Sequence, residues 1–355
     1  MRSQRTQRSP GFTPTGTESL ISSRTAYNEE DSILQKELTM NENLNKAISY
    51  VEQYFVGKNT VVDVAFATLL AGGHIFLEDV PGLGKTTLAN LISRSLGLEF
   101  KRIQFTPDLL PSDISGVSVY DQKTQEFRLK RGPIFTNLLL ADEINRGTPK
   151  TQSALLEAMA EYQVTIDGTI VKLDRPFVVM ATMNPIEYEG TFPLPEAQLD
   201  RFMTRLTIGY PSKEKEEEIV TGFYARVKVI SDDVRIISRE ELTAMQKEVE
   251  GVFIAPELIT YIVSLVDATR HDDTVYLGLS PRGSIDLMRL SKAYAYLQNR
   301  DFVIPDDIKL VFPFISGHRL ILQAEARLRG VTTNEVVTNT LKNVPIPKLA
   351  DYSKQ

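Results

Sequence analysis

Short apolar runs alternate with segments of helical periodicity between about residue 74 and residue 210. Five runs are expected to form strands: 74–80, 100–106, 137–144, 177–184 and 205–210. They are almost wholly apolar, which is typical of parallel strands covered by helices on both faces. Between the first two, Leu88, Leu91, Ile92 and Leu96 fall on one helical face, and Gly97 is expected to stop that helix. The pattern predicts an α/β fold with a parallel five-stranded sheet.

Two segments interrupt this alternation. Residues 164–173 alternate around Asp167-Gly168, a strong signal for a tight hairpin. Residues 117–130 form a second, looser hairpin pattern. Each hairpin is either a plain edge addition or a functional insert.

The pattern changes after Pro211 to helical segments. One helix should begin near Pro256, with Leu258, Ile259, Ile262, Val263 and Val266 on one face. No comparable strand signal appears before about residue 329. The expected organisation is a disordered leader (1–26), an α/β core (27–210), a helical lid domain (211–330) and a tail packing on that lid (331–355).

Composition narrows the function classes. The 355 residues include three His and no Cys, so a zinc site is not expected. The net charge of -6 argues mildly against a nucleic-acid groove. No apolar run approaches the roughly 20 residues of a membrane helix. The absence of Cys fits a reducing compartment, so we expect a cytoplasmic protein without membrane insertion.

A phosphate-binding loop is predicted at 78–87, between a strand and a helix. Its candidate nucleotide-binding residues are Asp79, Pro81, Gly82, Leu83, Gly84, Lys85, Thr86 and Thr87. Backbone N–H groups of such a loop surround phosphates, a Lys neutralises the outer phosphates and a hydroxyl ligates Mg²⁺. Lys85 and Thr86 fit these two roles. Asp79 departs from the general pattern, which has Gly there; Val80-Pro81 can shape the turn instead.

A pair of carboxylates ends another predicted strand. Asp142 and Glu143 follow four apolar residues, and buried carboxylates are costly unless they are paired or metal-bound. We expect Asp142 to hold Mg²⁺, through water, and Glu143 to orient or deprotonate the attacking water. The alternative is an acidic helix cap.

These motifs and their neighbours resemble MoxR-type AAA+ ATPases. The resemblance runs from about residue 37 to the C-terminal tail, and its longest stretches are EDVPGLGKTTLA, LLLADEINRGTPKTQSALLEAMAEYQVTIDG, VVMATMNPIEYEGTFPLPEAQLDRF and LSPRGSIDLM. It implies ATP and Mg²⁺ as cofactors, ATP hydrolysis, and a homo-oligomer, expected to be a hexameric ring. It also implies protein clients, among them proteins with von Willebrand factor A domains.

The resemblance assigns roles to further residues. Asn184 matches the polar residue that senses the γ-phosphate. Arg201 matches an arginine finger that reaches the neighbouring subunit's nucleotide, with Arg205 as a competitor. Arg282, in a first helical turn behind a Ser280 cap and Pro281, matches a second sensor that couples the lid to the γ-phosphate. Gly57 falls in the segment that contacts adenine.

Rival functions remain open at this point. The chain could be a nucleotide-regulated binding subunit with little turnover, a nucleic-acid motor, or a chelatase-type motor subunit. The carboxylate pair and Asn184 argue against a binding subunit with little turnover. The negative net charge argues against a nucleic-acid motor. Steady-state phosphate release, salt-dependent DNA binding and metal insertion, respectively, would discriminate them.

Overall fold

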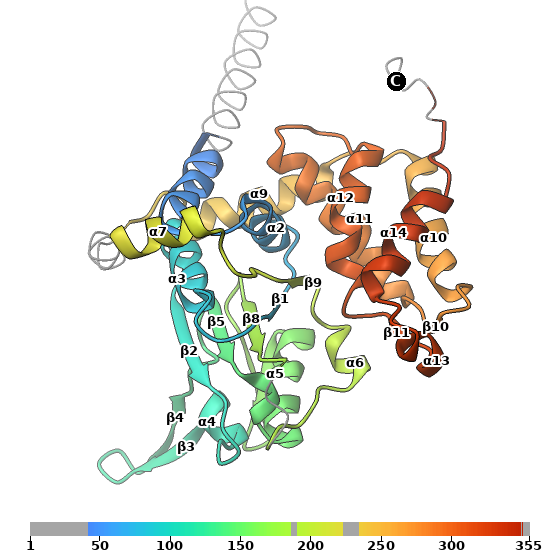
Figure 1. The fold of residues 1–355 in the computed structure, drawn as a ribbon. Coiled ribbons are helices and arrows are strands. Elements are labelled where there is room, and N and C mark those ends of the chain that lie inside the picture. Colours follow the sequence, from blue (N-terminus) through green and yellow to red (C-terminus); the bar gives the residue numbers. More distant parts are fainter. Residues whose placement is uncertain (1–41, 186–189, 223–233, 349, 351–355) are drawn as a thin grey trace, which may run out of the picture. The chain divides into compact units, whose positions relative to one another are not determined.

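The structure, a computed structural model, describes residues 42–185, 190–222, 234–348 and 350 (Figure 1). The described residues from Asn43 onward belong to one compact unit. The predicted leader (1–26) lies outside the described residues. Residues 42–54 are helical and precede α2 (Asn59–Leu70).

A parallel five-stranded sheet organises the first part of the chain, as the apolar runs predict. Its order is β2-β5-β8-β1-β9. The strands are β1 (Ile75–Glu78), β2 (Phe100–Gln104), β5 (Leu138–Asp142), β8 (Val178–Met183) and β9 (Thr204–Leu206). Strands β5, β8 and β1 are consecutive neighbours, so their carboxyl ends share one edge of the sheet.

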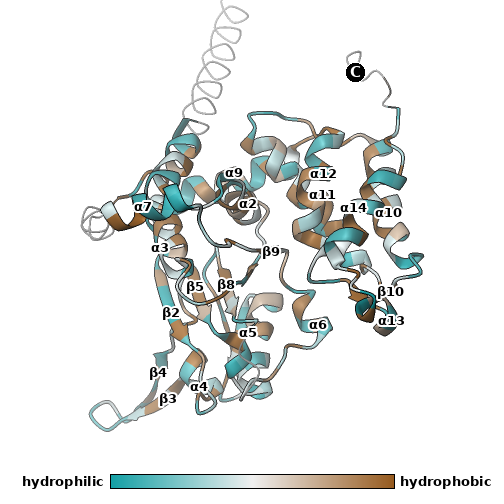
Figure 2. Ribbon diagram, in the orientation of Figure 1, coloured by the Kyte–Doolittle hydropathy of each residue, from teal (hydrophilic) through white to brown (hydrophobic). Residues whose placement is uncertain are grey.

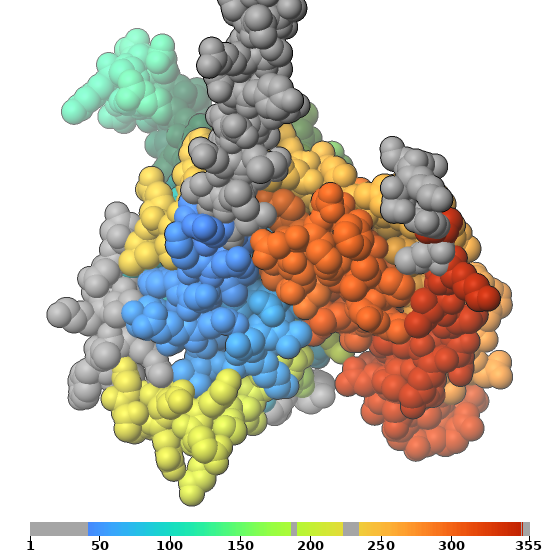
Figure 3. Space-filling model, turned by 90° about the horizontal axis from the view of Figure 1, so that it is seen from above, coloured from blue at the N-terminus to red at the C-terminus, as the bar shows by residue number. Residues whose placement is uncertain are grey.

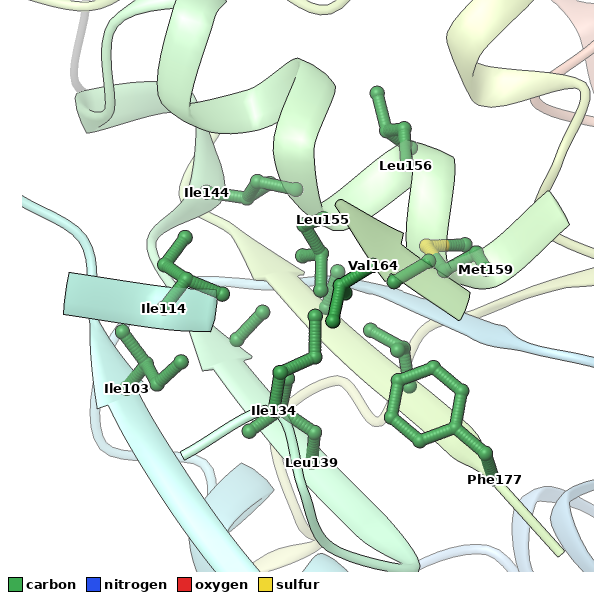
Figure 4. Close-up of a cluster of buried hydrophobic side chains, with 14 of the residues drawn as sticks. Ile103, Ile114, Ile134, Leu139, Ile144, Leu155, Leu156, Met159, Val164 and Phe177 are labelled. Carbon is green, nitrogen blue, oxygen red and sulfur yellow. The ribbon is translucent and has the colours of Figure 1, made fainter. Parts of the chain in front are cut away.

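Helices cover both faces of this sheet. Leu139 packs into a buried cluster with Leu155 and Met159 of α5 (Pro149–Glu161), as Figure 4 shows. Ile114 of α4 (Pro111–Ser115) joins the same cluster. Leu138 and Leu140 point to the opposite face and are also fully buried, beside α3 (Lys85–Ser95). Burial on both faces explains why the central strands are mainly apolar (Figure 2).

The two predicted hairpins are present and differ in their packing. The hairpin of β6 (Gln163–Ile166) and β7 (Thr169–Lys172) contributes Val164 and Ile166 to the buried cluster. The hairpin of β3 (Gly116–Asp121) and β4 (Glu126–Arg131) is largely exposed, and every β4 residue faces solvent. The Asp167 carboxylate accepts a hydrogen bond from the Ser118 N–H (3.1 Å), so the tip of one hairpin contacts the other.

The segment after residue 211 is mainly helical. Its helices are α7 (Lys213–Thr221), α9 (Arg239–Gly251), α10 (Pro256–Arg270), α11 (Pro281–Leu297), α12 (Pro305–Ser316), α13 (Ala324–Leu328) and α14 (Thr333–Asn343). Helix α14 packs on α10 and α12, and α11 packs on α2. In the space-filling view of Figure 3, the orange part of the chain lies directly against the blue part. Among the described residues, no helix combines the length and apolar character needed to cross a bilayer.

Two details of this segment differ from the sequence predictions. A small antiparallel sheet of β10 (Val275–Leu277) and β11 (Ile321–Leu322) lies where no strand was expected, because such short strands leave almost no periodic signal. The predicted apolar face of α10 is also rotated. Ile259 and Val263 are 42% and 50% exposed, while Tyr261 and Leu265 are buried.

His74 is buried at the start of β1 in its neutral form. Its Nδ1 accepts a hydrogen bond from the Val179 N–H, and its Nε2–H donates to the Met159 carbonyl, both at 3.1 Å. The pKa of His74 is lowered from 6.5 to about 4, chiefly by burial; the hydrogen bond to Met159 opposes this shift, and the positive charges of Arg282 and Arg289 add to it. Protonation would therefore oppose folding.

This pKa predicts a pH-dependent stability. Between pH 6.5 and 4 the unfolded chain binds the proton more readily, so stability is full above pH 6.5 and falls as the pH drops. The contribution of His74 should be about 2 kcal/mol between pH 7 and pH 5. Urea unfolding at the two pH values should show a smaller loss for His74→Asn than for the parent. The exposed His271→Asn is the control, and a parental loss in His74→Asn would contradict the assignment.

Candidate nucleotide site

The predicted phosphate loop joins β1 to α3, and hydrogen bonds of the buried Asp79 hold it in place. The Asp79 side chain is only 6% exposed. Its carboxylate accepts hydrogen bonds from the backbone N–H groups of Ile208 and Gly209, in the segment after β9. The Asp79 carbonyl accepts from the Lys85 ammonium at 2.6 Å. Asp79 therefore braces the loop, which explains why a carboxylate stands where the general pattern has Gly.

Backbone conformation shapes the loop into an anion cradle. Gly82 and Gly84 have φ values of +86° and +82°, which side chains rarely adopt. The position of a Cβ on Gly82 is open space. Gly84 caps α3 and offers no side-chain acceptor to the first-turn N–H groups, which include those of Thr86 and Thr87. Phosphate oxygens are the ordinary acceptors at such a helix N-terminus.

Strand β8 connects the phosphate loop to the carboxylate pair. The Asp79 N–H donates to the Met183 carbonyl (3.2 Å), beside Asn184, which is 5% exposed. The Thr182 hydroxyl donates to Asp142 (2.5 Å) and accepts from the Glu143 N–H (2.9 Å). The structure thus brings together the phosphate loop, Asn184 and both carboxylates at one edge of the sheet.

Both carboxylates carry polar partners from the same edge. Arg102 of β2 bonds Asp142 through its Nη2 (2.5 Å) and Nε (3.1 Å). Glu143 accepts from the Gln104 amide (2.7 Å) and from Arg146 (3.1 Å). Glu143 also lies in the left-handed region with φ +54°, a strained conformation that is concentrated at functional sites. A bound Mg²⁺ would therefore compete with Arg102 for Asp142.

An apolar hollow opens beside the phosphate loop. Its volume is about 570 Å³, within the range of small-ligand pockets. Its lining comes from residues 54–56, from Pro81–Gly84 and Thr87 of the loop, from residues 208–211 and from α7, through Glu216, Ile219 and Val220. None of its lining residues comes from the described chain after Val220.

Gly57 lies next to this hollow without lining it. Its carbonyl accepts a hydrogen bond from the Lys215 ammonium (2.6 Å), which ties the segment to α7. A Cβ at Gly57 would meet the Phe55 ring at 2.3 Å, so the glycine is needed for that ring's position. Phe55 and its neighbours take the place at the hollow that the sequence interpretation gave to Gly57.

Thr86 and Asp142 are the residues that could hold a magnesium ion. No group of three or more His, Asp or Glu side chains with metal-binding spacing occurs in the described part of the chain. This fits Mg²⁺ in nucleotide sites, where one or two protein oxygens act together with substrate phosphates and water. The donor set of one hydroxyl and one carboxylate suits that chemistry.

Of the two candidate arginine fingers, Arg201 lies away from the phosphate loop of its own chain. Arg201 follows α6 (Glu196–Leu199), and its guanidinium donates to the Leu156 carbonyl of α5. The Met203 N–H donates to the His74 carbonyl, at the amino edge of the sheet. Strand β1 separates that edge from the phosphate loop by about 13 Å. Arg205, the competitor, pairs instead with Glu78 at 2.9 Å.

Arg282 belongs to the start of α11, which lies beside the segment that carries Arg201. Ser280 occupies the N-cap position of α11, but its hydroxyl donates to the Asp200 carboxylate (3.0 Å) and makes no cap bond. The structure therefore places the first turn of α11 beside the segment that carries Arg201. Arg282 is not among the residues that line the hollow beside the phosphate loop.

Several site residues were not found from the sequence. Thr182, Arg102 and Gln104 contact the carboxylates through neighbouring strands, so only the strand order reveals them. Tyr54, Phe55, Tyr210, Ile219 and Val220 line the hollow from segments on either side of the core. Their signal in the sequence was apolar character alone, which does not separate a lining residue from a core residue.

Comparisons with known proteins agree with this arrangement. The family model described as "ATPase family associated with various cellular activities (AAA)" matches residues 74–204, and the AAA lid domain matches residues 267–340. The fold and the two matches define an AAA+ ATPase with a C-terminal lid.

Individual relatives narrow the family. The chain is 40% identical to "Chaperone MoxR1" of Mycobacterium tuberculosis, over 88% of this chain and 84% of that protein. It is 49% identical to "Uncharacterized protein YeaC" of Bacillus subtilis, over 86% and 95% of the two chains. A solved structure of a candidate ATPase from Cytophaga hutchinsonii matches with a TM-score of 0.83 and 40% identity, over 90% and 99% of the chains. The chain belongs to the MoxR family of AAA+ ATPases.

The brace made by Asp79 gives a stability prediction. Asp79→Ala leaves the Ile208 and Gly209 N–H groups without their acceptor in a buried place. The loss should be about 2 kcal/mol of unfolding free energy. Asp79→Asn keeps one acceptor oxygen and should lose less. Urea unfolding measures both, and parental stability in Asp79→Ala would show that the brace is unimportant.

Proposed function

We propose that the chain binds and hydrolyses Mg²⁺-ATP at the edge formed by the phosphate loop and the carboxylate pair. The observation that carries this proposal is the continuous set of hydrogen bonds through β8. Asp79 of the loop bonds Met183, and Thr182 bonds both Asp142 and the Glu143 N–H. Two motifs far apart in sequence are thereby held at fixed relative positions, as phosphoryl transfer requires.

The loop fits a triphosphate. The N–H groups from Gly82 to Thr87 would donate hydrogen bonds to the phosphate oxygens, and Lys85 would leave the Asp79 carbonyl to neutralise the outer phosphates. Pro81 and Leu83 would hold the shape of the loop and line its apolar side. The adenine would occupy the hollow against Phe55 and Tyr210, with Gly57 supporting the Phe55 ring.

The carboxylates would divide the remaining work. The Thr86 hydroxyl and, through water, Asp142 would hold Mg²⁺, which would neutralise charge on the phosphates. Glu143 would position and deprotonate the attacking water. Asn184 can donate and accept at once, and would place that water against the γ-phosphate.

Glu143→Gln tests the assignment of the base. The variant should bind ATP like the parent, because Gln keeps the size and polarity of the side chain, and phosphate release should fall at least about 100-fold. Calorimetry and steady-state phosphate release measure the two properties. Glu161→Gln, at an exposed position at the end of α5, is the control. Turnover near the parental rate in Glu143→Gln would refute the role.

The arginines support action across a subunit boundary. Arg201 and the first turn of α11 lie together near the amino edge of the sheet, away from their own phosphate loop. In a head-to-tail ring, one subunit's surface meets the nucleotide of the next. We therefore assign both Arg201 and Arg282 to the neighbour's γ-phosphate in a homo-oligomeric, hexameric ring. For Arg282 this replaces the role within its own chain that the sequence suggested.

Mixed assemblies test this arrangement. Arg201→Ala and Arg282→Ala should each lower turnover about 100-fold or more, and Lys85→Ala should abolish it. An equal mixture of Arg201→Ala with Lys85→Ala should recover turnover, because roughly a quarter of random boundaries pair an intact site with an intact arginine. Arg282→Ala should behave in the same way. Absence of recovery in oligomers that exchange subunits would show that the arginine acts within its own chain.

We further propose that turnover remodels partner proteins in the cytoplasm. One relative carries the name chaperone, and the exposed β3–β4 hairpin offers Tyr120 and Phe127, which are 49% and 74% exposed, as a contact. The two rings lie 5.3 Å apart, edge to face. Proteins with von Willebrand factor A domains are the first partners to examine. Phosphate release that no such protein alters would count against this role.

A further inference from the structure

Arg319 is a buried cation directly after α12. Its side chain is 2% exposed, and it pairs with two carboxylates, Asp200 (2.7 Å) and Asp286 (2.6 Å). Its guanidinium also donates to backbone carbonyls: those of Asp200, Phe202, Met203 and Ile315. All three guanidinium nitrogens take part in these bonds, so the planar fork is fully used.

Most of these bonds hold one short segment, residues 200–203. Arg319 binds both the carboxylate and the carbonyl of Asp200, and the carbonyls of Phe202 and Met203. His318 adds a second bond to the Phe202 carbonyl from its Nε2 (2.9 Å). The segment contains Arg201, whose neighbours on both sides are therefore fixed by the residues after α12.

The second carboxylate partner of Arg319, Asp286, belongs to α11. Asp286 lies one helical turn after Arg282, on the same side of the helix. Ser280, two residues before Arg282, bonds the same Asp200 carboxylate that Arg319 holds. Arg289, in the next turn, donates to the Ala71 carbonyl at 2.5 Å. The start of α11 is thus joined to the segment of Arg201 through Asp200 and Arg319.

Stability alone explains this arrangement poorly. Arg319 and Asp286 are almost wholly removed from water, which is costly for each ion, and well-packed apolar residues often replace buried ion pairs without loss of stability. What a buried fork provides is geometry, because its N–H groups lie in one plane at fixed angles. Here that geometry fixes the relative position of residues 200–203 and the start of α11. Each of these two segments carries an arginine that lies away from the phosphate loop of its own chain.

We propose that Arg319 is a positioning residue that fixes Arg201 and Arg282 relative to each other, so that the two reach a neighbouring subunit's nucleotide together. The inference rests on the proposed ATP hydrolysis across a subunit boundary and extends it to a residue that touches no nucleotide. Arg319 acts through the carboxylates of Asp200 and Asp286 and through backbone carbonyls within residues 200–203.

Arg319→Lys keeps the charge and removes the planar fork. Its kcat should fall at least about tenfold while KM for ATP stays within about twofold, because the variant's own phosphate loop is untouched. Mixing it with Lys85→Ala protein should recover turnover, since Lys85→Ala subunits present intact arginines. Arg300→Lys is the matched control. Arg300 makes a comparable bidentate pair with the buried Asp307 (2.8 and 2.5 Å), away from residues 200–203.

Hydrogen exchange gives a readout that does not need turnover. Amide exchange at residues 200–204 and 282–286 should quicken about tenfold or more in Arg319→Lys and remain parental there in Arg300→Lys. Parental exchange and kcat in Arg319→Lys would overturn the proposal, as would an equal loss of kcat in Arg300→Lys or a loss that mixing does not recover. A parent without ATP turnover would instead refute the proposed function, and the exchange data would still decide whether Arg319 fixes the two segments.

Discussion

The geometry of the site depends on the two hydrogen bonds that the Thr182 hydroxyl makes. This hydroxyl lies on β8, fully buried, and contacts the Asp142 carboxylate and the Glu143 N–H on the neighbouring strand. On the other side of β8, the carbonyl of the next residue, Met183, accepts a hydrogen bond from the Asp79 N–H of the phosphate loop. The relative position of a phosphate cradle and a carboxylate pair is therefore set by strand pairing, which is among the stiffest features of a folded chain.

This dependence explains which features the sequence could predict. The strands and the phosphate loop follow from local patterns: an apolar run, two glycines that need positive φ, and a helix after them. The carboxylate pair was recognisable because charge at the end of a buried strand has no packing purpose. The structure confirmed the predicted five-stranded sheet, and the comparisons confirmed the predicted protein family.

The site residues that were not predicted from the sequence depend on contacts between distant segments, which no local pattern contains. Arg102 and Gln104 reach the carboxylates because β2 pairs with β5, and the bond of Ser280 to Asp200 spans 80 positions in the sequence. Asp79 looked like a departure from a glycine pattern, whereas its carboxylate binds N–H groups that lie more than a hundred residues later. The rotated face of α10 has a different cause: exposed Ile259 and Val263 continue the apolar periodicity beyond the buried stripe.

In the proposed function, Asp142 and the phosphate loop bind one magnesium-nucleotide together, which makes metal and nucleotide binding interdependent. Calorimetric titration with a slowly hydrolysed ATP analogue, with and without Mg²⁺, measures this coupling in the parent and in Asp142→Asn. Mg²⁺ should tighten nucleotide binding about tenfold or more in the parent, and most of this gain should disappear in Asp142→Asn. An equal gain in both proteins, or no nucleotide binding by the parent, would contradict it.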